Sequence, residues 1–231
     1  METRNLKEIL IVGNLGLGDA LIQNAIVHHY AEDHEVTFLC KSHNKISVAF
    51  QFRTNDRITV LDVEGDDEAG EIVKACKGAG KKVLGLGFYG NPPLPNPPQL
   101  GWDKFMYEQA GMPFMDRWNK FRVARQESME LEVPKGRYVF CHDDPSRGYV
   151  IRPETLPAKT RIIRPERTAK NNIFEYWGII ENAWEIACID SSFAILADSL
   201  PVRKAKRMTL HKYARPGGVE PTYLNRWEVL S

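Results

Sequence analysis

Apolar residues along the chain form short runs that alternate with amphipathic stretches. Residues 7–14 (KEILIVGN) are β-branched and apolar and stop at Gly13, which is typical of a strand buried on both faces. Three later runs of this kind predict further strands, over 34–40, 57–63 and 81–88. Helical spacing predicts helices over 19–33 and 68–80. Strands alternating with helices in this way indicate βαβ units and an open parallel sheet.

The pattern breaks at residues 91–101, where five prolines in eleven residues exclude a helix or a strand. We expect an ordered loop there, including Pro92 to Pro98, that either shapes a binding site or connects two parts of the chain. A helix resumes over 103–112 and ends at Gly111 and Pro113. The charged and aromatic stretch 114–136 closes this first half.

A second βαβ series follows. Its apolar runs predict strands over 137–144, 160–166, 185–192 and 206–213, with helices over 171–183 and 193–200. The tail, 221–231, ends in an apolar run that could close this sheet or pack back on the first half. We therefore predict an α/β fold of two Rossmann-like parallel-sheet halves, residues 1–125 and 126–231.

Net charge, hydropathy and cysteine spacing exclude several classes of function and site. A formal net charge of +1 argues against a partner bound by bulk electrostatics and leaves room for a local basic patch. The N-terminal apolar run is too short for a secretory signal, and no segment is long enough to span a membrane. The four cysteines show no CxxC spacing, so we expect reduced thiols and a cytoplasmic protein without a zinc site.

A glycine-rich turn directly follows the first strand and leads into the first helix. Gly13, Gly16 and Gly18 are spaced GxxGxG, which is neither the dinucleotide fingerprint nor the Walker motif. Backbone N–H groups in such a turn can approach an anion or a sugar closely. Asp19 could act as a general base on an acceptor hydroxyl, or it could simply cap the helix.

A second turn, CIDSSFAILA, ends a strand and opens a helix at residues 188–197. The hydroxyl and N–H groups of Ser191 and Ser192 would face a phosphate at the carboxyl edge of a parallel sheet. Asp190 would accept hydrogen bonds from sugar hydroxyls. The alternative is that Ser191 serves only as the N-cap of the helix.

Charged residues also follow the strand at 137–144. Arg147, in a Ser-Arg-Gly turn, can contact a phosphate in bidentate fashion, and Arg164, Arg167 and Lys212 could add positive charge at the same edge. His142, Asp143 and Asp144 could instead hold a divalent metal, or this loop could be a solvated Asp–Arg pair. A Ser–His–Asp triad can be drawn from these residues, but no G-x-S-x-G elbow supports a hydrolase.

Taken together, two segments resemble the heptosyltransferase-type glycosyltransferases of the GT-B class. ILIVGNLGLGDALIQNAIVHHYA resembles their opening strand, loop and first helix, and WEIACIDSSFAILADSLPV resembles their C-terminal Asp-Ser turn and helix. The resemblance implies an acceptor-binding half at 1–125, a nucleotide-sugar-binding half at 126–231, and transfer without an obligatory metal or separate cofactor.

Carried over residue by residue, the resemblance makes Asp19 the base and places Asn14, Gly16 and Gly18 in the acceptor-side loop. It makes Arg147, Asp190, Ser191 and Ser192 the donor and phosphate site. The acceptor would be a polysaccharide, a lipid-linked glycan or, in a viral setting, a hydroxymethylated DNA base.

A different class of function stays open, namely a catalytically silent nucleotide- or sugar-binding module in a larger assembly. The chain is shorter than typical members of the family, and Ser192-Phe193-Ala194-Ile195 replaces their usual sequence after the Asp-Ser pair. An epimerase is disfavoured, because the sequence has neither a dinucleotide fingerprint nor a Tyr-x-x-x-Lys motif after the first strand. Asp19 discriminates between the two: an Asp19 that lines an open cleft between the halves, facing Arg147 and Ser191, favours the enzyme, and a capped and buried Asp19 favours the binding module.

Overall fold

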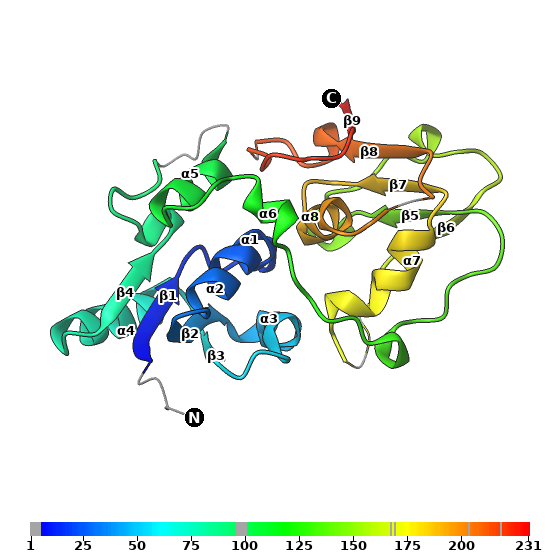
Figure 1. Cartoon of the computed structure of the whole chain (residues 1–231). Helices are drawn as coiled ribbons and strands as arrows, with labels where there is room; N and C mark the ends of the chain where they lie inside the picture. The colour runs from blue at the N-terminus through cyan, green and yellow to red at the C-terminus, as the bar shows by residue number, and fades with distance from the viewer. Residues whose placement is uncertain (1–5, 96–100, 167, 169, 203, 218) are drawn as a thin grey trace. The chain divides into compact units, whose positions relative to one another are not determined.

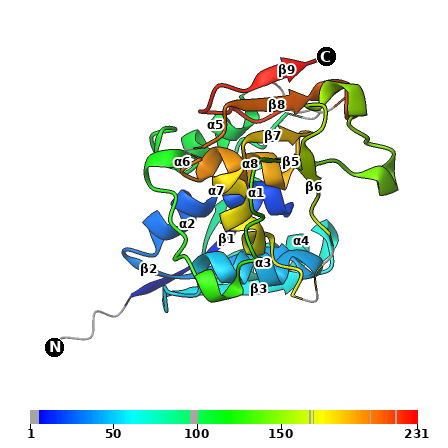
Figure 2. The same cartoon turned by 90° about the vertical axis from the view of Figure 1, so that its right-hand side faces the viewer.

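A computed structural model describes residues 6–95, 101–166, 168, 170–202, 204–217 and 219–231 (Figures 1 and 2). The chain divides into two compact units, Met1–Ala124 and Arg125–Ser231. Each unit contains one parallel sheet with its own buried core. The predicted α/β fold with two Rossmann-like parallel sheets is thus confirmed.

The first sheet has the strand order β3-β2-β1-β4. Its strands are β1 (Lys7–Val12), β2 (His34–Lys41), β3 (Ile58–Val63) and β4 (Lys82–Gly85). The helices of this unit are α1 (Leu17–Ile22), α2 (Asn24–Tyr30), α3 (Lys45–Phe52), α4 (Asp66–Gly78), α5 (Trp102–Gln109) and α6 (Asp116–Asn119). Leu10, Val12, Leu39 and Val63 of the strands pack with Ala69 of α4, which places part of the core between sheet and helix.

The predicted helix over 19–33 is divided into α1 and α2 at Gln23. The side chain of Gln23 is fully buried, and its Nε2 donates to the carbonyls of Asn14 at 3.2 Å and Asp19 at 3.0 Å. Because these bonds turn the Gln23 side chain back toward the loop, the residue both distorts the helix and holds the glycine-rich turn. Helix α3 was not predicted from the sequence.

The second sheet has the order β6-β5-β7-β8-β9. Its strands are β5 (Tyr138–His142), β6 (Arg161–Ile163), β7 (Glu185–Cys188), β8 (Arg207–His211) and β9 (Glu228–Leu230), and its helices are α7 (Trp177–Asn182) and α8 (Ser192–Ser199). Short 3-10 turns replace the rest of the helix predicted over 171–183 and occupy the loop after β5. The C-terminal tail closes the sheet, since β9 pairs in parallel with β8.

Burial explains the composition of the central strands. Four consecutive residues of β1 and four of β5 are buried, as expected when helices cover both faces of a parallel sheet. Cys40, Cys141 and Cys188 lie in such strands as buried free thiols, and burial raises the pKa of each. Among the described residues, no helix is long and apolar enough to cross a membrane.

Strand order reverses once in each sheet. In the first unit β2 and β3 extend from one side of β1 and β4 from the other; in the second, β6 lies on one side of β5 and β7 on the other. Loops leave such a switch point in opposite directions, which opens a crevice at the carboxyl ends of the two strands. The two candidate sites are therefore expected after β1 and β4, and after β5 and β7.

Candidate active site

The loop after β1 meets the loop after β4 at the first switch point. Asn14 joins them, because its Oδ1 accepts a hydrogen bond from the Phe88 backbone N–H at 3.1 Å while its Nδ2 donates to Asp19 Oδ1 at 3.1 Å. Gly87 makes this approach possible, since its φ is +59° and a Cβ there would lie 2.4 Å from Asn14 Oδ1. Asn14 thereby fixes the carboxylate of Asp19.

A cavity of about 600 Å³ opens at this point, which we call the first-sheet pocket. Its lining residues are Asn14, Leu15, Gly16, Asp19, Lys41, Asp66, Asp67, Phe88 and Tyr89. Asp19 lies in the first turn of α1 and is partly exposed to this cavity. Gly16 allows its position, because a Cβ on Gly16 would lie 2.4 Å from Asp19 Oδ2. Gly18, by contrast, lies within α1 and does not line the pocket.

The first-sheet pocket is acidic. Asp66 and Asp67 come from the first turn of α4, and the Lys41 ammonium lies 3.5 Å from the Asp66 carboxylate. The Tyr89 hydroxyl donates to Asp66 Oδ1 at 3.1 Å, and burial together with this bond raises the pKa of Tyr89. Carboxylates and aromatic rings suit hydroxyl groups and the apolar faces of a sugar better than they suit a phosphate.

The second switch point brings together residues from the ends of β5 and β7. His142, the last residue of β5, lies with its Nδ1 at 2.9 Å from the hydroxyl oxygen of Ser191. Ser191 is also the N-cap of α8, where its Oγ accepts a long 3.4 Å bond from the Ala194 N–H. The cap alternative for Ser191 is therefore realised, and the same hydroxyl faces a histidine.

The His142 ring is held neutral by its surroundings. It packs against the Phe193 ring with centroids 4.6 Å apart. Burial lowers the pKa of His142 from 6.5 to about 4, against the opposing effect of nearby Asp143 and Asp144. A neutral imidazole can take or give a hydrogen bond to Ser191 but adds no charge to a phosphate site.

Positive charge at this edge comes from two arginines around one aromatic ring. The Arg147 and Arg215 guanidinium carbons lie 5.3 Å and 5.8 Å from the centroid of Tyr149. Arg147 belongs to a tight turn in which Asp144 and Tyr149 exchange backbone hydrogen bonds and Gly148 has a φ of +77°. Its Nε donates to Asp144 Oδ2 at 2.5 Å, and the Arg147 side chain is 58% exposed.

Asp190 is engaged from two directions. Its Oδ1 accepts a hydrogen bond from the Tyr223 hydroxyl at 2.9 Å, and Arg215 donates to its backbone carbonyl. The Arg215 guanidinium also lies 3.9 Å from Asp190 Oδ2. Burial raises the pKa of Asp190, although Tyr223 and Arg215 partly oppose this. Arg215 and Tyr223 were not predicted at this site, and Tyr223 lies 33 residues beyond Asp190 in the tail.

The other predicted donor residues have partners of their own, and Lys212 also acts electrostatically on Asp190. Lys212 pairs with Glu220 at 2.9 Å, and Arg164 Nε donates to the buried Asp143 carboxylate at 3.1 Å. Ser192 begins α8 and is partly exposed beside Ser191. Arg167, like Pro97 and Pro98, lies outside the described residues.

The metal alternative at His142, Asp143 and Asp144 finds no geometric support. The three side chains diverge to Ser191, Arg164 and Arg147 respectively. In the described part of the chain, no three His, Cys, Asp or Glu side chains group closely enough to hold an ion.

Comparison with known proteins identifies this architecture. No protein-family model matches the chain, and no curated protein has a similar sequence. Among solved structures, a glycosyl transferase family 9 protein from Veillonella parvula aligns over 97% of this chain and 86% of its own, with a TM-score of 0.59 and 12% identity.

Two structures of TibC are also similar. TibC from enterotoxigenic E. coli, described as a bacterial iron-containing dodecameric glycosyltransferase, aligns with a TM-score of 0.53 and 15% identity. The heptosyltransferase TibC in complex with ADP-D-beta-D-heptose aligns with a TM-score of 0.50 and 12% identity. In both cases the alignment covers 89% of this chain and 58% of TibC. The chain therefore has the two-sheet α/β fold of heptosyltransferase-like, GT-B-type glycosyltransferases.

Proposed function

We propose that the protein is a glycosyltransferase that moves a sugar from a nucleotide-sugar donor to an acceptor hydroxyl. One observation carries the proposal: a partly exposed carboxylate, Asp19, is held by Asn14 in an open pocket at a topological switch point. A buried, fully capped Asp19 would have favoured a silent binding module. The shared fold with glycosyltransferases supports the same reaction class.

The second unit would hold the donor. Arg215 and Arg147 would face the diphosphate, and the Ser191 hydroxyl at the start of α8 would donate to a phosphate oxygen. Because a TibC structure contains ADP-D-beta-D-heptose, an ADP-linked sugar is the first donor to test. The nucleotide sugar is a substrate, and no separate cofactor enters the reaction.

The first unit would hold the acceptor. Asp19 would take the proton from an acceptor hydroxyl as that oxygen bonds to the anomeric carbon of the donor. The bond between the anomeric carbon and the phosphate oxygen breaks, and its electron pair leaves with the nucleoside diphosphate. Arginines beside the leaving group would stabilise the charge that develops there.

The pocket's acidity favours a glycan acceptor over DNA. Asp66 and Asp67 would repel phosphates close to Asp19, and Lys41 is already beside Asp66. Phe88, 45% exposed, and Tyr89 offer ring faces on which a pyranose can lie. Of the expected acceptors, a polysaccharide or lipid-linked glycan in the cytoplasm suits these residues better than a hydroxymethylated base in a duplex.

The test is a thermal-shift screen against ADP-, UDP-, GDP-, CMP- and dTDP-sugars, followed by a transfer assay with the stabilising donor. A donor at a hundred times its dissociation constant adds about 2.7 kcal/mol to the free energy of unfolding. We expect Arg215→Gln and Ser191→Ala to weaken this stabilisation and Lys212→Gln, whose charge is paired with Glu220, to keep it. If none of the nucleotide sugars raises the melting temperature, the donor site is refuted.

A pair of variants tests Asp19. Asp19→Asn removes the base, whereas Gly16→Ala keeps the carboxylate but displaces it, since the new Cβ would lie 2.4 Å from Asp19 Oδ2. Both should lose transfer and retain donor binding. If Asp19→Asn transfers sugar at the wild-type rate, Asp19 is not the base and the binding-module interpretation gains.

A further inference from the structure

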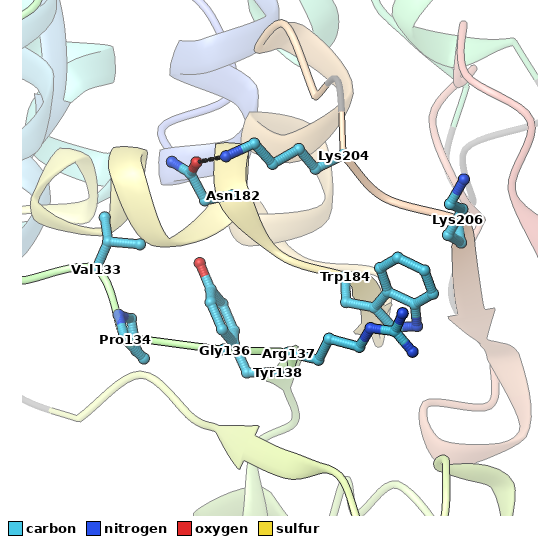
Figure 3. A pocket seen from close by; sticks show the side chains of 9 residues that line it. All are labelled: Val133, Pro134, Gly136, Arg137, Tyr138, Asn182, Trp184, Lys204 and Lys206. Carbon is cyan, nitrogen blue, oxygen red and sulfur yellow. Dashed lines mark hydrogen bonds between the residues drawn. The ribbon is translucent and has the colours of Figure 1, made fainter.

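A second pocket of the second unit lies at the opposite end of its strands from the site described above. It has a volume of about 600 Å³ and opens at the amino ends of β5, β7 and β8 (Figure 3). The residues that line it are Val133, Pro134, Gly136, Arg137, Tyr138, Asn182, Trp184, Lys204 and Lys206. A volume of this size accommodates a small organic ligand.

Trp184 is the centre of this pocket, and the sheet fixes its place. Its backbone N–H donates to the Tyr138 carbonyl at 2.9 Å, and its own carbonyl accepts from the Lys206 N–H at 2.8 Å. These bonds extend the parallel ladder one residue beyond β7, so Trp184 lies in register between Tyr138 and Lys206. The indole is partly exposed and rigidly placed.

Two cations lie by the indole, and a third lines the pocket beside Asn182. The Arg137 guanidinium lies 4.2 Å from the Trp184 ring centroid and the Lys206 ammonium 5.6 Å from it, while Lys204 Nζ donates to the neutral Asn182 at 2.5 Å (Figure 3). Within the described ranges, no carboxylate lies within 4 Å of any of these three charges.

The carboxylate next along the chain, Glu185, does not neutralise this group. It acts on Arg207, which is itself paired with Glu228 at 2.7 Å. The pocket therefore holds three positively charged side chains, two of them beside one aromatic ring, in a protein whose net charge is only +1. Such a local excess attracts a ligand with more than one negative charge.

We propose that this amino-end pocket binds a nucleoside phosphate. The base would lie against the Trp184 indole, and the phosphates would be bound by Arg137, Lys204 and Lys206. A flat ring beside fixed cations is the combination that binds nucleotides, either free or within a single strand. The pocket uses none of the residues assigned to sugar transfer, so the proposal stands apart from that function.

The first experiment measures ADP binding to the full chain by equilibrium dialysis. We expect two sites if the carboxyl-end site also binds ADP and one site if it does not. Arg137→Gln/Lys206→Gln should weaken the amino-end site at least about tenfold, since each change removes a charged phosphate contact. Trp184→Leu should weaken it about fivefold or more, the lower end of the effect of removing one stacking partner. Arg215→Gln should leave this site unchanged, so failure of the donor proposal is read separately.

The second experiment distinguishes a strand from a free nucleotide. Fluorescence anisotropy of a labelled oligodeoxythymidylate, with ADP as competitor, should show tight binding only if the pocket holds part of a single strand. If the ligand is a single strand, the Arg137→Gln/Lys206→Gln variant loses two phosphate contacts. The plot of log affinity against log salt concentration then becomes less steep by about 1.4.

Lys74→Gln/Lys77→Gln is the matched control, because it removes two exposed lysines from α4 without touching the pocket. It should bind both ligands like the wild type. If this control loses as much affinity as the pocket variant, the ligand binds by bulk charge only and the proposal is overturned. The same holds if heparin displaces the ligand and Trp184→Leu does not change its affinity. Wild-type binding by the Arg137→Gln/Lys206→Gln variant would also overturn the proposal, provided its circular dichroism melt shows a folded protein.

Discussion

His211 offers a test of how the second unit is stabilised, through its response to acid. The ring is fully buried at the end of β8, with Nε2 2.9 Å from Thr209 Oγ1 and Nδ1 3.0 Å from the Tyr213 hydroxyl. The hydrogen bonds run in one direction. The Thr209 hydroxyl donates to the Ile186 carbonyl at 3.3 Å, so Nε2–H donates to Thr209, and in the neutral ring Nδ1 accepts from the Tyr213 hydroxyl.

This chain of bonds assigns a neutral imidazole that carries its proton on Nε2. Protonation of Nδ1 would require the Tyr213 hydroxyl to turn its hydrogen from the ring to the more distant Thr155 Oγ1 at 3.4 Å. Burial, and to a lesser extent Arg207, lowers the pKa of His211 from 6.5 to about 4, against the opposing charges of Asp143 and Glu228. The folded unit therefore binds this proton much more weakly than the unfolded chain.

The sign and size of the effect follow from linkage. Between pH 6.5 and pH 4 the unfolded state binds more protons, so the free energy of unfolding falls as the pH falls. At about 1.4 kcal/mol per pKa unit, acidification from pH 7 to pH 5 removes about 2 kcal/mol through this one residue. His142, whose pKa is also lowered to about 4, removes a similar amount.

Urea unfolding at pH 7 and pH 5 measures this loss. His211→Gln keeps an amide between Thr209 and Tyr213 but cannot titrate, so its loss between the two pH values should be about 2 kcal/mol smaller than that of the wild type. His29→Gln, at an exposed position of α2, is the control and should lose as much as the wild type. If His211→Gln loses stability as steeply as the wild type, the neutral-imidazole assignment is wrong.

Three further variants test other parts of the structure. Asp19→Asn should lower the turnover number about a hundredfold or more in a transfer assay with the identified donor, with little change in donor affinity, whereas Asp67→Asn should be much less affected. Gly148→Ala should destabilise the second unit by about 1 kcal/mol in urea melts, because its φ of +77° disfavours a Cβ even though the space around it is open. Asp103→Ala should lower the free energy of unfolding by about 3–5 kcal/mol in the same assay, because it leaves the charge of Arg117 buried without its partner. The two side chains form an ion pair and are at most 1% exposed. A loss under 1 kcal/mol would contradict this reasoning.

Much of the fold follows from local pattern, and the exceptions have physical reasons. Short β-branched runs ended by Gly13 or by Asp-Ser-Ser were read correctly as buried strands, because burial on both faces leaves a continuous apolar run. Helix α3 was missed because its residues 45–52 mix apolar and polar side chains between two strong strand signals. Strand β9, three residues long, exists only because β8 offers it an edge, so the sequence left its place open.

The candidate sites show the same division. Asp19, Ser191 and Arg147 were predicted because they lie in turns that follow strands, and such turns reach the carboxyl edge of a parallel sheet. Tyr223 and Arg215 lie beyond β8 and reach Asp190 through tertiary structure, which no local spacing reveals. Lys212 was predicted at the donor site from its position after β8, and in the structure it pairs with Glu220, eight residues along the chain.

Strand order decides which of these loops meet. Sequence places Asn14 after β1 and Phe88 after β4 but cannot show that β4 lies beside β1, on the side away from β2. That neighbourhood brings Phe88 to Asn14, and Asn14 in turn holds the carboxylate of Asp19. The second unit repeats the arrangement, since β7 beside β5 brings Ser191 to His142. The chemistry of both edges thus depends on the two strand-order reversals, and it is there that substitutions should separate activity from stability.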